Sequence, residues 1–104
     1  MAQTYNGGFI VATTTGTTVT TGASSASITI PNTSAGSKPR FVRVAATVES
    51  YVKIGVAGVT ATTNDILVQP ADAAILSIPD GITTIAYIQG ATSGKVNVLP
   101  LESI

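Results

Sequence analysis

Apolar and polar side chains alternate with a period of two residues along much of this chain. The stretch FVRVAATV, residues 41–48, is the clearest case, because one parity carries Val42, Val44, Ala46 and Val48. Successive side chains of a β-strand point to opposite faces of the sheet. The pattern therefore predicts a strand with one buried and one wetter face, as in antiparallel sheets.

Short segments of this kind recur between Gly, Pro, Asn and Ser residues, and no helical periodicity lasts three turns. Val, Ile and Thr dominate the composition, and these β-branched residues favour strands. Chain reversals are predicted at Pro79-Asp80-Gly81 and between Gly90 and Gly94. We therefore predict an all-β fold, an antiparallel β-sandwich of seven to nine short strands with a jelly roll as the favoured topology. The predicted strands are 9–13, 17–21, 27–30, 40–48, 51–56, 66–69, 73–78, 83–89 and 95–99.

The parity of these strands predicts which side chains form the core. On the strand 83–89 both parities are apolar, so the pattern leaves open whether Ile85 or Ala86 points inward. The predicted core consists of Val42, Val44, Val52, Ile54, Ile85 or Ala86, Ile88, Val96 and Val98.

The first part of the chain differs in composition from the rest. No side chain in residues 1–37 is charged, and Lys38 carries the first charge. We divide the chain into this Thr/Gly/Ser-rich segment and a sandwich body, residues 38–104, which together form one domain. The segment has two interpretations: it supplies polar edge strands and loops, or it is an arm that contacts another subunit. Under the second, the candidate inter-subunit contacts are Tyr5, Phe9, Ile10 and Val11.

The composition excludes several classes of function. Only 10% of the 104 residues are charged, against roughly 25% in a typical globular protein, and the formal net charge is zero. Nucleic acid and anionic membranes require clustered Lys and Arg, so we expect neither as a partner. The chain has no Cys and no His, which removes disulfides, thiolate metal sites and the usual general base. We expect a protein that is not an enzyme, with no catalytic residue, metal or cofactor.

Three groups of side chains remain as candidate chemistry. The acids Glu49, Asp65, Asp72 and Asp80 fall in different predicted turns, so paired-carboxylate catalysis is not expected. Calcium binding by Asp65 and Asp72 is an open alternative, although the alternating acids of a dedicated calcium loop are absent. Stacking of a sugar on tyrosines is a second alternative. A third group, of basic side chains, is predicted on neighbouring strands, as a solvated face or as partners of Glu49. The residues concerned are Tyr5, Tyr51 and Tyr87 for the sugar, and Arg40, Arg43 and Lys53 for the basic face.

The second half of the chain resembles small decoration, or cement, proteins of tailed bacteriophage capsids. The resemblance covers roughly residues 41–99. It is carried by VKIG at 52–55, NDILVQP at 64–70, the turn PDG at 79–81 and the hairpin IAYIQGATSGKVNV at 85–98. It implies a jelly-roll or sandwich domain that binds the outside of the assembled head and stabilises contacts between major capsid subunits.

The resemblance also implies partners and a location. The expected partner is the major capsid protein, the expected state is a homo-oligomer (dimer or trimer), and the expected location is the outer capsid surface of the virion. The first residues have no basic region followed by an apolar run, so we expect synthesis in the host cytoplasm without export. The alternative function is a phage fibre, tail or carbohydrate-binding β-sandwich module.

Overall fold

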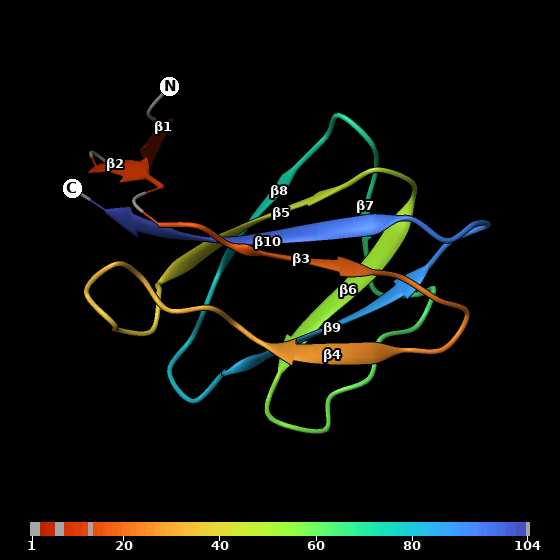
Figure 1. Cartoon of the computed structure of the whole chain (residues 1–104). Coiled ribbons are helices and arrows are strands. Elements are labelled where there is room, and N and C mark those ends of the chain that lie inside the picture. Colours follow the sequence, from red (N-terminus) through yellow and green to blue (C-terminus); the bar gives the residue numbers. More distant parts are fainter. Residues whose placement is uncertain (1–2, 6–7, 13, 104) are drawn as a thin grey trace.

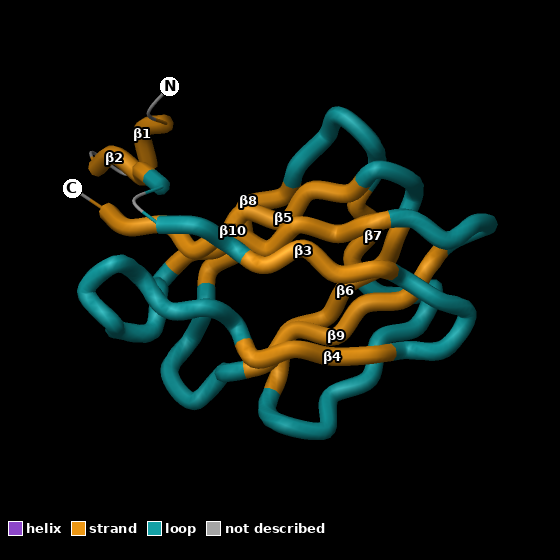
Figure 2. The backbone as a smooth tube through the Cα atoms, viewed as in Figure 1, coloured by secondary structure: helices purple, strands orange, loops and turns teal. Residues whose placement is uncertain are grey.

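The computed structural model describes residues 3–5, 8–12 and 14–103. All regular elements within these residues are strands, and eight of them form two packed antiparallel sheets (Figures 1 and 2). The strands are β1 (Gln3–Tyr5), β2 (Gly8–Val11), β3 (Thr17–Thr20), β4 (Ala26–Thr29), β5 (Phe41–Ala46), β6 (Ser50–Gly55), β7 (Ile66–Val68), β8 (Ala74–Ser77), β9 (Thr84–Gln89) and β10 (Lys95–Ser103).

The sandwich is a jelly roll. One sheet has the order β3-β10-β5-β8 and the other the order β4-β9-β6-β7. The pairing is nested along the chain, since β3 pairs with β10, β4 with β9, β5 with β8 and β6 with β7. Eight strands wound in this way across two sheets define the jelly-roll topology. The predicted fold class is confirmed.

The hairpin of β1 and β2 lies at one end of the sandwich, beside the end of β10 (Figure 1). Strand β2 pairs with the last residues of β10 through Val11–Glu102 and Ile10–Ser103, and β1 pairs with β2. The pairing of β10 with β5 stops at Leu101. The hairpin therefore pairs with the part of β10 that continues beyond the four-stranded sheet. All nine predicted strands have a counterpart in β2 to β10, whereas β1 was not predicted.

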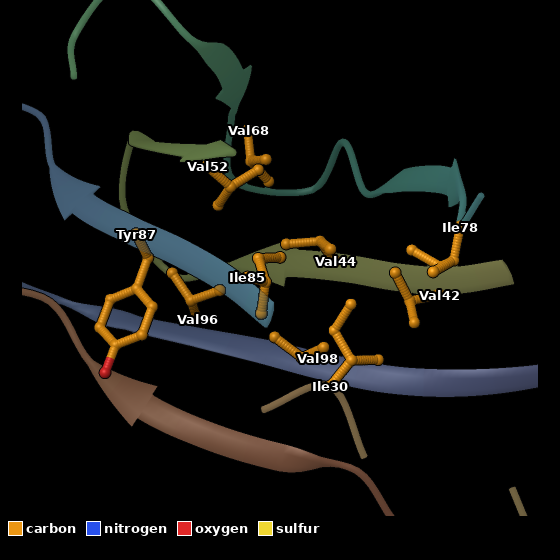
Figure 3. Close-up of a cluster of buried hydrophobic side chains, with 10 residues drawn as sticks. All are labelled: Ile30, Val42, Val44, Val52, Val68, Ile78, Ile85, Tyr87, Val96 and Val98. Carbon is orange, nitrogen blue, oxygen red and sulfur yellow. The ribbon is translucent and has the colours of Figure 1, made fainter. Parts of the chain in front are cut away.

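The core lies between the two sheets and consists mainly of β-branched side chains (Figure 3). The predicted positions Val42, Val44, Val52, Val96 and Val98 are all fully buried there. Of the two candidates on β9, Ile85 and Ala86, it is Ile85 that points into the core. The predicted core residue Ile54, on β6, is half-buried and packs against the core. The cluster is completed by four residues that the sequence pattern did not predict, namely Ile30, Val68, Ile78 and Tyr87.

The prediction that Ile88 lines the core is wrong. On β9, Tyr87 lies opposite Val52, whereas Ile88 lies opposite Tyr51. Directly opposite residues of an antiparallel pair share a face. Because Val52 points into the core, Tyr87 also points inward, and Ile88 belongs to the outer face. A shift by one residue exchanges the two faces of a strand, and Ile88 has the opposite parity to Ile85.

The β3–β4 connection is joined to the β9–β10 connection through Thr21, which is almost fully buried. Its N–H donates to the Gly94 carbonyl at 2.8 Å, and its hydroxyl both donates to that carbonyl and accepts from the Gly94 N–H at 2.9 Å. The Ser93 hydroxyl donates to the Thr21 carbonyl. These bonds tie the edge strand β3 to the start of β10.

Thr21→Val is therefore expected to lower the free energy of unfolding by about 1–3 kcal/mol, because the Gly94 N–H loses its partner in a partly buried position. Urea denaturation followed by circular dichroism measures the change. Thr29→Val, on the exposed face of β4, is the matched control and should stay within about 0.5 kcal/mol of the wild type. Equal effects of the two variants would contradict the assigned role of Thr21.

Candidate interaction surfaces

The register of the sheets defines two outer faces. The fully buried valines of β5, β6 and β10 define the inward parity of these strands, and the cross-strand register extends it to the others. The alternate residues belong to the outer faces. We call the outer face of the β3-β10-β5-β8 sheet the β10 face. Its residues are Thr18, Thr20, Phe41, Arg43, Ala45, Ile75, Ser77, Lys95, Asn97, Leu99 and Leu101. We call the outer face of the other sheet the β9 face, with Ser27, Thr29, Tyr51, Lys53, Leu67, Thr84, Ala86 and Ile88.

A hollow of about 260 Å³ lies on the β10 face. Its floor includes the small side chain of Ala45, which lies opposite Asn97 on β10. The Asn97 amide donates to the Thr18 hydroxyl at 3.1 Å, and the Lys95 ammonium donates to the Thr20 hydroxyl at 3.2 Å. These cross-strand bonds hold two long side chains along the hollow. Ala46 and Thr47 complete its lining.

Beside the hollow, a row of side chains crosses three strands of the β10 face. Arg43 on β5 lies between Leu99 on β10 and Ile75 on β8. Both aliphatic side chains are half-buried and Arg43 is exposed. The face thus combines apolar side chains with two cations, Arg43 and Lys95, and its outward strand positions listed above include no carboxylate.

The β9 face carries a different row. Tyr51 on β6 lies between Ile88 on β9 and Leu67 on β7, and Leu67 is 42% exposed. Lys53 is its one cation among the outward strand positions. Arg43 and Lys53 therefore belong to different sheets and opposite faces, and the prediction that they lie on neighbouring strands is wrong. Although β5 and β6 are consecutive in the chain, their connection crosses from one sheet to the other.

Four of the acids lie outside the strands, at Glu49, Asp65, Asp72 and Asp80. The Asp65 carboxylate accepts hydrogen bonds from the Thr62 N–H at 2.7 Å and from the Thr62 hydroxyl at 3.2 Å. These bonds shape the turn that leads into β7. Within the part of the chain that the structure describes, no group of three acidic, His or Cys side chains is placed to hold a metal ion.

A sugar platform that combines Tyr51 and Tyr87 is wrong. Tyr87 is 7% exposed and belongs to the core cluster, whereas Tyr51 is half-buried on the β9 face. The two rings lie on opposite sides of the same sheet. Of these two rings, only that of Tyr51 lies on an outer face.

The candidate inter-subunit contacts lie on the hairpin. Tyr5 is the last residue of β1, and Phe9, Ile10 and Val11 belong to β2. The structure describes their backbone pairing, but their side chains lie outside its described part. Their role in contacts between subunits stays a prediction.

The hollow and the Leu99-Arg43-Ile75 row were missed by the sequence analysis. The residues of the hollow come from three strands, and β3 and β10 are far apart in the sequence. The adjacent small residues Ala45 and Ala46, which follow Arg43 and Val44, are the local signal from which a depression in the sheet could have been suspected.

Neither family models, nor curated proteins, nor solved structures gave a match to this chain. Among the described residues, no helix is long and apolar enough to cross a membrane.

Proposed function

We propose that this chain is a capsid decoration protein of a tailed bacteriophage, which binds the outside of the assembled head and stabilises contacts between major capsid subunits. The β10 face is the observation that carries the proposal. It offers a hollow, half-buried aliphatic side chains and two cations on a rigid antiparallel sheet. A sheet face of this kind can be seated on another folded protein without rearrangement.

The composition of this face favours burial against protein. Thr18, Ala45 and Asn97 are neutral, and removing an ion from water carries a penalty of several kcal/mol that these side chains avoid. Arg43 and Lys95 complement carboxylates on a partner, which would set the orientation of docking. We therefore expect the contacted surface of the major capsid protein to present apolar side chains flanked by Asp or Glu.

The fold and the symmetry of a head support the same proposal. Jelly rolls occur in viral capsid proteins, although the topology alone does not define a function. Many copies on one shell add their contacts by avidity, so a modest contact per copy is sufficient. The protein would act at the outer capsid surface after synthesis in the host cytoplasm. The hairpin residues Tyr5 and Phe9–Val11 remain predicted contacts to neighbouring subunits.

The alternative, a fibre, tail or carbohydrate-binding module, would use the other side of the sandwich. The row Ile88-Tyr51-Leu67 on the β9 face favours it, because it places an aromatic ring between two aliphatic side chains. The two candidate functions thus assign binding to opposite faces.

Arg43→Glu is expected to reduce binding to heads at least tenfold, whereas Lys53→Glu on the opposite face leaves it unchanged. Reversing Arg43 removes one charge pair and creates repulsion with partner carboxylates, and tenfold corresponds to about 1.4 kcal/mol. Heads of the phage that encodes the chain, prepared without it, are mixed with each variant, sedimented and imaged by cryo-electron microscopy.

Regular added density on the heads for the wild type and Lys53→Glu, and its loss for Arg43→Glu, would support the proposal. Absence of the wild-type chain from purified virions and from added-back heads would refute the decoration function. Loss of binding for Lys53→Glu alone would show that the β9 face, and not the β10 face, is the docking surface.

A further inference from the structure

The two edge strands on one side of the sandwich carry no charge. Strands β3 and β4 are the outer strands of the two opposing sheets, on the same side of the sandwich (Figure 1). Residues 14–30, which include both strands and their connection, contain no charged side chain and no proline. Open edges usually carry charges, prolines or other features that block pairing with further strands.

One of the two opposite edges, that of β7, is protected. Strand β7 has only three residues, and Pro70 follows it two positions after its end. Asp65 precedes this strand, and Asp72 lies in the connection to β8. On the β3 and β4 side, in contrast, neither sheet edge carries a charge or a proline, which indicates that these edges are available for pairing with another chain.

The hydrogen bonds of β3 show which of its backbone groups point outward. The Thr21 N–H donates to the Gly94 carbonyl, so the Thr21–Gly94 pair is a hydrogen-bonded one. Hydrogen-bonded and non-bonded pairs alternate along an antiparallel ladder, and Val19 and Thr17 therefore also direct their backbone groups towards β10. The N–H and C=O groups of Thr18 and Thr20 point away from the sheet.

We infer that two copies of this chain pair through the β3 edges, antiparallel about a twofold axis at Val19. In this register Thr18 lies opposite Thr20 of the second copy and Thr20 opposite its Thr18, so the outward backbone groups of both copies bond to each other. Val19 lies opposite itself as a non-bonded pair. Inner and outer faces match across the junction, as sheet continuity requires.

Pairing through the β4 edges is compatible with the same twofold axis. The Ile30 N–H donates to the Thr83 carbonyl, so Ile28 is directed towards β9 and Ser27 and Thr29 point outward. Pairing of β4 with itself about Ile28 sets Ser27 opposite Thr29 of the second copy. Val19 lies four residues before Ala23 and Ile28 four residues after Ser24, so the β3–β4 connection is symmetric about its middle. One axis normal to both sheets can therefore relate both edges.

Pairing would bury more apolar surface of the inner side chains at this axis. Val19 and Ile28 are half-buried and pack against the core cluster. A second copy covers their remaining exposed surface with the same two residues. No like charges meet across the junction, because the paired strands have none. The expected dimer has two continuous eight-stranded sheets, and it does not depend on capsid binding.

Thr18→Pro tests this interface on the isolated protein. Proline removes an N–H that the single chain does not use, and proline is tolerated on an edge strand when its N–H side faces solvent. Ser77→Pro on β8 is the matched control, because the Ile78 N–H donates to the Arg40 carbonyl and the Ser77 N–H therefore points outward from the opposite edge. Sedimentation equilibrium should give twice the chain mass of 10.4 kDa for the wild type and Ser77→Pro, and the single mass for Thr18→Pro.

A cysteine at the axis gives a second readout that does not require proline. The chain has no cysteine, so Val19→Cys introduces a single thiol. Non-bonded antiparallel pairs have Cα atoms about 4.5 Å apart, within the range that disulfides span. Oxidised Val19→Cys should migrate as a covalent dimer on a non-reducing gel, whereas Ser77→Cys should not.

A wild-type chain that stays monomeric up to millimolar concentration would overturn the inference. A dimer that persists in a folded Thr18→Pro variant would equally overturn it, because the interface would then lie elsewhere. If Thr18→Pro unfolds, the comparison of disulfide cross-linking between Val19→Cys and Ser77→Cys tests the interface instead. Cross-linking of Val19→Cys alone supports pairing through the β3 edge, and equal cross-linking of the two variants contradicts it.

Discussion

Ile85→Ala is expected to lower the free energy of unfolding by about 3–4 kcal/mol, within the range for Ile→Ala in a packed core. Ile85 has no exposed surface and lies on β9, between β4 and β6. Its cross-strand neighbours on the inner face are Ile28 and Ile54, and the opposite sheet covers it with valines (Figure 3). Removal of its outer carbons leaves a cavity that β-branched neighbours, stiff at χ1, fill poorly.

Ile88→Ala is the matched control, because it removes the same atoms from the same strand three residues further on. Ile88 is half-buried on the β9 face, so the expected loss is about 1 kcal/mol. Urea denaturation measures both losses. If the free energy of unfolding depends equally on urea concentration in the two variants, the transition midpoints compare their stabilities directly. Equal losses would mean that β9 does not have the parity described above.

The contrast between these two residues shows where sequence patterning reaches its limit. On β5 and β6 a charged residue, Arg43 or Lys53, marks the outward parity, and the predicted inward residues were correct. On β9 the sequence TIAYIQ is apolar on both parities, so the pattern could not choose between them. The choice is made by the pairing of Tyr87 with Val52, a contact between distant segments.

The N-terminal segment illustrates a second limit. Thr and Ser suit an edge strand as well as a loop, so composition left both interpretations of residues 1–37 open. The structure places residues 17–20 and 26–29 in the two sheets as β3 and β4. Strand β1, with three residues, is too short to show a period. Deletion of the first twenty-five residues would remove β3 from the sandwich, so contacts of the arm must be tested with shorter deletions.

The candidate surfaces were less predictable than the fold. The β10 face joins residues of β3, β5, β8 and β10, and their adjacency depends on the nested pairing of the jelly roll. Local alternation predicts that Arg43 points outward but cannot predict that Leu99 and Ile75 flank it. The resemblance to decoration proteins rests on strands and the turns that join them, which specify the scaffold and not the docking surface.

Gly16→Ala is expected to lower the free energy of unfolding by about 2–3 kcal/mol. A Cβ at Gly16 would clash with the Val98 carbonyl oxygen and would lie 2.8 Å from the Leu99 Cα. Both are backbone atoms of β10, which β3 and β5 flank, so neither can turn aside as a side-chain end would. The clash must be relieved by moving β3 away from β10, and overpacking of this kind typically costs 1–3 kcal/mol.

Gly22→Ala is the control for this variant, since a Cβ at Gly22 meets no atom within 4 Å. At such a site alanine lowers the entropy of the unfolded chain, and stability should stay unchanged or rise by up to about 1 kcal/mol. Thermal unfolding followed by circular dichroism should show a melting temperature lower by about 10–20 °C for Gly16→Ala alone. Because the same shift displaces Thr18 and Thr20, a folded Gly16→Ala chain should also lose the proposed dimer. Unchanged melting would show that the Gly16 backbone does not approach β10 as closely as described.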